Sequence, residues 1–75
     1  MSLTEDEIKR ISRVFDANLV MRLNLVNLKL RDIQAVSSLG QLFYINLTNN
    51  ELTNIDVLFT LPVIRVIIAD SNKVR

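Results

Sequence analysis

The sequence predicts an α/β solenoid. In this fold an N-terminal capping helix precedes repeated strand-and-loop units, with a short parallel β-sheet on the concave face and 3₁₀ or loop segments on the convex face. Three observations indicate it. An amphipathic helical pattern opens the chain, apolar residues then recur at the same offsets in successive windows of 22 residues, and the stretch INLTNNELTNI (45–55) breaks strand-like alternation with polar turn residues.

Residues 4–17 (TEDEIKRISRVFDA) predict the capping helix, and we assign residues 1–19 to it. Thr4 and Glu7 have the spacing of a capping box, and Leu3 and Ile8 that of a hydrophobic staple. Three acidic residues occupy the first turn, where the helix dipole favours negative charge. The apolar stripe comprises Ile8, Ile11, Val14 and Phe15. A partner-binding or membrane-surface helix is the alternative, disfavoured by a narrow stripe and a polar face of mixed charge.

The repeat is clearest between residues 42 and 63. The positions that define the repeat are Leu42, Ile45, Leu47, Asn50, Leu52, Ile55, Leu58 and Leu61. Subtracting 22 gives Val20, Leu23, Leu25, Leu28, Leu30, Ile33, Val36 and Leu39, and adding 22 to the first five gives Ile64, Ile67, Ala69, Asn72 and Val74. The sequence therefore predicts one domain with two whole units, 20–41 and 42–63, and a partial unit, 64–75.

Each unit has a physical interpretation. Residues 42–47 predict a strand whose Ile45 and Leu47 point inward. Asn50, and Asn72 after it, would pair with buried backbone groups at the corner of the chain. The following apolar residues are spaced by three, which favours a 3₁₀-like segment lining the outer, convex side. The first unit departs from this pattern, because Leu28 stands at the asparagine position and cannot make such bonds.

The offsets match the pattern L-x-x-L-x-L-x-x-N-x-L, and the chain resembles the leucine-rich repeat family. It is similar to the subclass with 22-residue units found in regulatory subunits of protein phosphatase 1 and in the A-prime protein of a spliceosomal ribonucleoprotein, where a helix also caps the first repeat. The resemblance implies an intracellular setting, cytoplasmic or nuclear, and a protein partner on the concave face.

The last predicted strand, around VIRVIIA (63–69), would be an open apolar edge in which Arg65 is the only charge. Three explanations stay open at this point. The chain is a fragment of a longer solenoid, it dimerises through this edge, or it is a short and poorly capped protein.

The concave-face residues follow from the register. One column holds Arg22, Tyr44 and Val66, and the next holds Asn24, Asn46 and Ile68. Tyr44 is the strongest single candidate anchor, because a large amphipathic ring loses little entropy when fixed. The asparagines have two interpretations, as partner contacts or as residues bonded to solvent and to each other. These six residues are the predicted partner-binding site.

Composition argues against several other classes. The chain has 75 residues, a net charge of +1, one glycine and no Cys, His or Trp, which argues against disulfides, Cys/His zinc sites, glycine-rich phosphate loops and His- or Cys-based catalysis. We therefore expect no enzyme, no cofactor, no metal and no membrane span, and nucleic acid is a disfavoured partner. The expected function is a non-catalytic protein-interaction module; the alternatives are a homodimer formed through the last strand and a ribonucleoprotein component.

Overall fold

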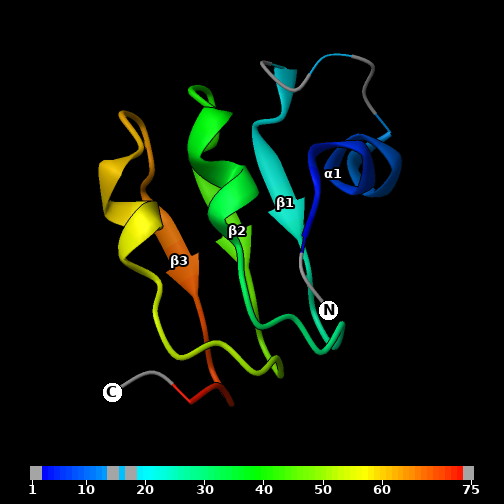
Figure 1. Ribbon diagram of the computed structural model, residues 1–75. Coiled ribbons are helices and arrows are strands. Elements are labelled where there is room, and N and C mark those ends of the chain that lie inside the picture. Colours follow the sequence, from blue (N-terminus) through cyan, green and yellow to red (C-terminus); the bar gives the residue numbers. More distant parts are fainter. Residues whose placement is uncertain (1–2, 14–15, 17–18, 74–75) are drawn as a thin grey trace.

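In the computed structural model, which describes residues 3–13, 16 and 19–73, the chain is an α/β protein with one α-helix and a three-stranded parallel sheet. Figure 1 shows the strands side by side, with α1 beside β1 and the two 3₁₀ helices on one side of the sheet. The elements in chain order are α1 (Glu5–Ser12), β1 (Arg22–Asn24), η2 (Gln34–Ser38), β2 (Tyr44–Asn46), η3 (Asp56–Thr60) and β3 (Val66–Ile68).

Helix α1 begins at the predicted cap but is shorter than predicted. The Thr4 hydroxyl accepts the Glu7 N–H at 3.2 Å and donates to Glu7 Oε1 at 3.3 Å, and Ile8 is fully buried. The helix ends at Ser12 rather than at residue 17, because Arg13 takes a left-handed conformation (φ 62°) and its N–H bonds to the Lys9 carbonyl at 2.8 Å. Val14 and Phe15 of the predicted stripe lie outside the described residues.

The three strands pair in parallel at the predicted offset of 22 residues. Leu23 is opposite Ile45, which is opposite Ile67 on the other side. Leu23 and Ile45 are buried and Ile67 is half-buried, so one face of the sheet supplies the core. The strands span three residues each, shorter than the predicted 42–47, and backbone bonds between neighbouring units continue into the turns, from the Asn27 N–H to the Thr48 carbonyl at 3.0 Å and from the Asn49 N–H to the Asp70 carbonyl at 2.9 Å.

The segments after the turns form 3₁₀ helices, as the spacing of three predicted. The helices η2 and η3 occupy equivalent positions 22 residues apart. The segment after Asn50 was predicted on the outer side of the coil, and its helix η3 lies across the core from the sheet (Figure 1). Its apolar residues are turned inward, because Leu52 and Leu58 are fully buried, Leu61 is buried and Ile55 is half-buried. These side chains point from the 3₁₀ layer toward the sheet, which removes their apolar surface from water.

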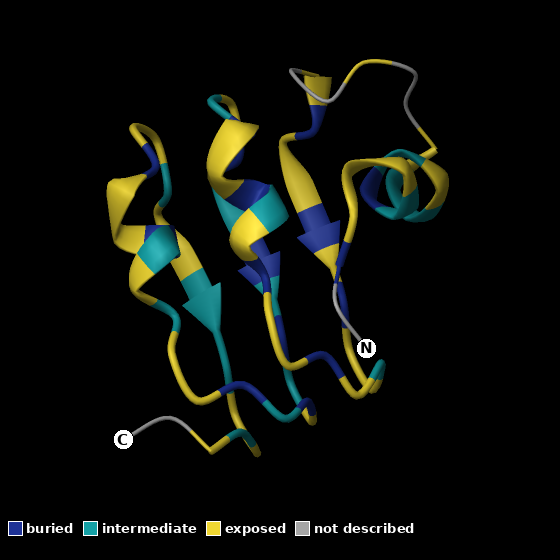
Figure 2. Cartoon of the chain, viewed as in Figure 1, coloured by how far each residue is buried: buried dark blue, intermediate teal, exposed yellow. Residues whose placement is uncertain are grey.

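The core lies between the sheet and the 3₁₀ layer, and Figure 2 shows buried residues in α1, β1, η2, β2 and η3 but none in β3. Its position explains the apolar phase of the sequence, since units 20–41 and 42–63 contribute buried residues at the same offsets. The buried apolar residues are Leu3, Ile8, Val20, Leu23, Leu25, Leu30, Ile33, Val36, Leu39, Leu42, Ile45, Leu47, Leu52, Leu58 and Leu61.

Asn50 is the buried polar residue of this core, at 5% exposure. Its Nδ2 donates to the carbonyls of Leu25 and Leu47, both at 2.8 Å, and its Oδ1 accepts from the N–H groups of Leu28 and Leu30 at 3.1 and 3.0 Å. The residue therefore joins two neighbouring turns, as the corner role predicted. The Leu28 side chain cannot take that role, yet the Leu28 N–H is satisfied by the next unit.

Asn72 repeats the arrangement one unit later. Its Nδ2 donates to the carbonyls of Leu47 at 2.8 Å and Ala69 at 3.1 Å, and its Oδ1 accepts from the Leu52 N–H at 3.1 Å. The Leu47 carbonyl thus accepts from both asparagines. Paired backbone groups at both turns explain how the chain reverses direction without leaving buried donors and acceptors unsatisfied.

The turns also contain a left-handed residue at one repeated position. Asn27, Asn49 and Ser71 have φ values of 67°, 63° and 57°. Asparagine tolerates this conformation better than most residues. Two of these residues also bond to each other, since Asn49 Nδ2 donates to Asn27 Oδ1 at 2.7 Å.

Candidate interaction surface

The sheet face, defined as the side of the sheet turned away from the core, carries all six predicted site residues. Arg22, Tyr44 and Val66 form one row across the strands, and Asn24, Asn46 and Ile68 form the next. They alternate with the core-facing residues along each strand, so they share one side of the sheet. The structure therefore brings the predicted residues together, in the predicted register.

Arg22 and Tyr44 are in direct contact on this face. The Arg22 guanidinium carbon lies 5.5 Å from the centre of the Tyr44 ring and 5.7 Å from that of Phe43, within cation–π distance of both. These contacts restrict a side chain that would otherwise be flexible. Arg22 is exposed and Tyr44 is half-buried, so the pair forms a partly ordered polar and aromatic surface on adjacent strands.

A recess adjoins this pair at the boundary between α1 and the sheet. It is lined by Ile11 and Ser12 of the helix, Arg22, Leu23 and Asn24 of β1, and Tyr44 of β2. The Ser12 hydroxyl donates to the Ile8 carbonyl at 2.6 Å within the helix. The helix thus has a second role besides covering the core, because it supplies one wall of the recess.

The two asparagines of the face do not bond to each other; each bonds to the residue two positions further along the chain. Asn46 Oδ1 accepts from the Thr48 N–H at 3.1 Å and the Thr48 hydroxyl at 2.7 Å, and Asn24 Oδ1 accepts from the Val26 N–H at 3.4 Å. Their oxygens therefore stabilise the chain beyond each strand. Neither Nδ2 group has a hydrogen-bond partner among the described residues.

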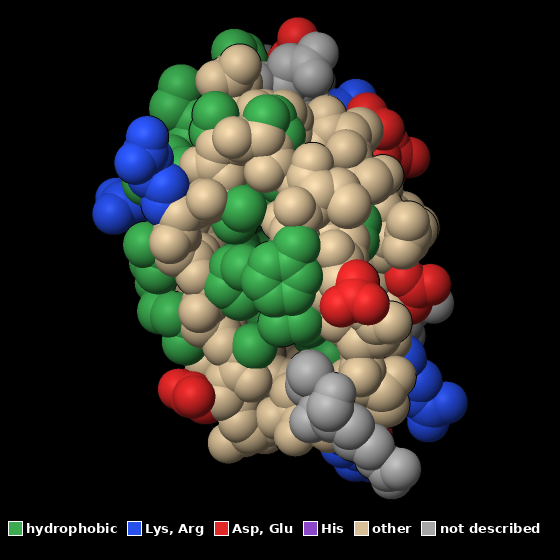
Figure 3. Space-filling view, turned by 90° about the vertical axis from the view of Figure 1, so that its left-hand side faces the viewer, with side chains coloured by type: hydrophobic (Ala, Val, Ile, Leu, Met, Phe, Trp, Pro, Cys, Tyr) green, Lys and Arg blue, Asp and Glu red, His purple; other side chains and the backbone are tan. Residues whose placement is uncertain are grey.

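The face becomes apolar toward β3. Val66 is 40% exposed and Ile68 is half-buried, where the other two strands present Arg22, Tyr44 and asparagines. Figure 3 looks onto the side of the molecule where β3 lies and shows hydrophobic side chains gathered across it. Phe59 and Val63 of the preceding unit, at 66% and 37% exposure, are further exposed apolar residues outside the sheet face.

The edge of β3 is open within the described part of the chain. β3 pairs with β2, through the Val66 N–H to the Phe43 carbonyl at 3.0 Å and the Leu47 N–H to the Ile68 carbonyl at 2.6 Å. Because backbone groups alternate in direction along a strand, those of Ile67 point to the opposite, unpaired side. An apolar strand with free backbone groups favours association with another strand.

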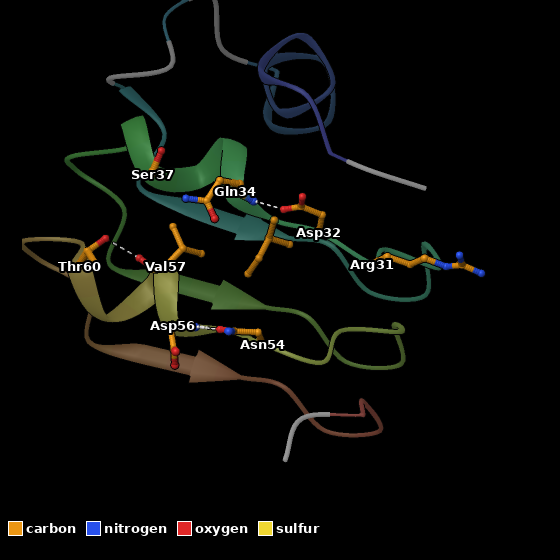
Figure 4. A pocket seen from close by; sticks show the side chains of 9 residues that line it. Arg31, Asp32, Gln34, Ser37, Asn54, Asp56, Val57 and Thr60 are labelled. Carbon is orange, nitrogen blue, oxygen red and sulfur yellow. Dashed lines mark hydrogen bonds between the residues drawn. The ribbon is translucent and has the colours of Figure 1, made fainter.

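A second hollow lies between η2 and η3, on the other side of the molecule (Figure 4). Its acidic and amide side chains already have a local role. Asp32 Oδ1 accepts the Gln34 N–H at 2.7 Å, and Asn54 Oδ1 accepts the Asp56 N–H at 2.6 Å, so both cap the start of a 3₁₀ helix. Among the residues that the structure describes, no group of three His, Cys, Asp or Glu side chains could hold a metal ion.

Three residues of this surface are additions to the sequence-based site: Phe43, Ile11 and Ser12. The 22-residue register already indicated that Arg22 and Tyr44 are neighbours. It held no information on the orientation of the arginine or on how closely the C-terminal turn of α1 approaches β1.

Within its described residues the chain has no helix with the length and apolarity needed to cross a membrane. No protein-family model matches the sequence, and searches of curated proteins and of solved structures gave no significant match.

Proposed function

We propose that this chain is a leucine-rich-repeat type interaction module that binds a protein partner on its sheet face and catalyses no reaction. The repeat interpretation is supported by the constant offset of 22 residues between paired strands, by the equally spaced 3₁₀ helices and by the two asparagine corners. The resemblance noted in the sequence suggests an intracellular setting for the module.

The observation that carries the proposal is the composition of the sheet face. Arg22 and Tyr44 are residue types that dominate binding energy in protein interfaces, and they lie in contact on adjacent strands. The strands position them on a sheet whose opposite side is packed core, so a partner would meet a preorganised surface. The exposed aliphatic side chain of Val66 lies in the same row.

The test is a selection of binding peptides from a randomised library, followed by affinity measurements on two variants. Tyr44→Ala should raise Kd by about 10-fold or more, as expected for a central anchor. The matched control is Phe59→Ala, which removes an exposed aromatic ring from η3, away from the sheet face, and should change Kd less than about 2-fold. Selected peptides that depend on Phe59 and not on Tyr44 would overturn the proposal.

A second candidate function is homodimerisation through β3, favoured by its open edge and by the exposure of Val66 and Val63. Sedimentation of the chain over a wide concentration range should then show a dimer, and Ile68→Lys should convert it to a monomer by placing charge beside the shared edge. Val26→Lys, at an exposed position after β1, is the control and should leave the dimer intact. A monomer at every concentration would eliminate this function.

A further inference from the structure

Arg22 is a cation without an anionic partner inside the described chain. Two surface cations, Lys9 and Arg31, form ion pairs, with Glu5 at 3.6 Å and with Glu51 at 3.7 Å. Arg22 instead contacts two aromatic faces, and no described carboxylate pairs with it. A guanidinium carries five N–H donors in a planar fork, which suits a planar, bidentate acceptor.

The recess beside Arg22 is lined by a further amide donor and by no carboxylate. Asn24 lies two residues along the same strand and on the same face, and its Oδ1 accepts from the Val26 N–H, while its Nδ2 has no hydrogen-bond partner among the described residues. Both side chains line the recess, whose walls are Ile11 and Tyr44. A site with cationic and amide donors and partly apolar walls selects a carboxylate, because charge-assisted bonds strengthen where water is excluded.

The remainder of the face specifies what accompanies that carboxylate. From β1 to β3 the face changes from Arg22 and Asn24 to Val66 and Ile68. Two strand spacings separate these ends, which is roughly 10 Å. A ligand that crosses the strands would therefore meet donors at one end and aliphatic side chains at the other.

We infer that the sheet face binds a protein segment in which an Asp or Glu side chain enters the recess and bonds Arg22, while a large apolar side chain roughly 10 Å away covers Val66 and Ile68. This inference rests on the proposed function and specifies its partner. In a helical segment the two side chains would be seven residues apart, given a rise of about 1.5 Å per residue. In an extended segment alternate residues share a face, so the two side chains would be two or four residues apart, about 7 or 13 Å.

The experiment uses the peptides selected on the intact chain, synthesised with blocked termini so that no terminal carboxylate is present. Each peptide is compared with a version in which its acidic residue is changed to the amide. Loss of the acid should raise Kd about 10-fold or more, and the parent affinity should weaken with added salt. Versions with a free C-terminus and no acidic side chain should bind weakly; equal binding would assign the recess to a terminal carboxylate and overturn the side-chain assignment.

A charge exchange supplies the specificity readout. Arg22→Glu should reject the acidic peptides and bind versions that carry lysine in place of the acid, and Arg22→Lys should recover part of the original affinity. The control Arg31→Gln removes the same charge from the turn after β1 and should leave Kd within about 2-fold. Variants that have unfolded are identified by circular dichroism, and in that case the peptide substitutions decide alone.

The outcomes separate the two proposals. Peptides that depend on Tyr44 but show no preference for an acid, and no response to Arg22→Glu, would overturn this inference and leave the sheet-face function standing. Peptides that bind without dependence on Tyr44 or Arg22, or a library that yields no binder, would count against both. If sedimentation shows that the chain self-associates, the aliphatic end of the face would be assigned to a second copy of the chain instead of to a peptide, and this inference would be overturned.

Discussion

Asn50 offers the sharpest test of how the turns are held together. Asn50 is only 5% exposed, and its side chain makes four hydrogen bonds of 2.8–3.1 Å to the backbone of two turns. Replacing it with alanine leaves two carbonyls and two N–H groups without that partner. Each bond contributes a net stability of about 0.5–1.5 kcal/mol, so the total loss lies between about 2 and 6 kcal/mol.

The lower part of that range is the expected result. Leu28 is half-buried, so water can replace part of what Asn50 provides, and the Leu47 carbonyl keeps its bond from Asn72. We therefore expect a loss of about 2–4 kcal/mol. A chain of this length has an unfolding free energy of roughly 4–11 kcal/mol, so the variant would lose a large share of its stability.

The assay is equilibrium unfolding in urea, followed by far-ultraviolet circular dichroism. With an m value of about 1 kcal/mol/M, the midpoint for Asn50→Ala should fall by roughly 2 M or more. Asn54→Ala is the matched control, because Asn54 is exposed and bonds one N–H group, and it should cost about 1 kcal/mol or less. Equal midpoints for Asn50→Ala and the parent, with equal m values, would refute the corner role.

Three further predictions concern stability. Leu47→Ala should cost about 2–5 kcal/mol, because Leu47 is fully buried and its removal leaves a cavity; an unchanged thermal midpoint would contradict its inward position. Gly40→Ala should raise stability by about 0.4–1 kcal/mol, since Gly40 has no positive φ and an added Cβ meets no atom within 4 Å, and a lower urea midpoint would show hidden strain. Ser71→Asn should raise stability by about 0.5–1 kcal/mol, because Ser71 has a φ of 57° at the position where Asn27 and Asn49 stand; a decrease measured by calorimetry would reject this explanation.

Several parts of the structure were predictable because they depend only on the spacing of apolar residues in the sequence. In-phase apolar residues can all be buried only if each strand pairs with the strand 22 residues further on, and the register of Leu23, Ile45 and Ile67 follows from that condition. The spacing of three after Asn50 similarly predicted a 3₁₀ helix, although not that Leu58 points into the core from it.

Other parts depended on information that a period does not contain. The end of α1 is set by the left-handed conformation of Arg13, and the helical spacing of apolar residues that continues past it to Val14 and Phe15 gave no sign of that conformation. The sequence left two interpretations of Asn24 and Asn46, as partner contacts or as residues bonded to solvent and to each other. The structure shows a bond that neither interpretation included, since Asn46 Oδ1 accepts from the N–H and the hydroxyl of Thr48 two residues further on.

The sequence by itself therefore determined which residues share a side of the sheet, because alternation along short strands and a constant repeat length leave one arrangement that buries the leucines. Only the tertiary structure decided what the exposed side offers. The direction of the Arg22 side chain depends on its contacts with Phe43 and Tyr44, and the recess beside it depends on where α1 comes to rest. Both are set by packing between elements distant in the chain, which the pattern of apolar positions does not specify.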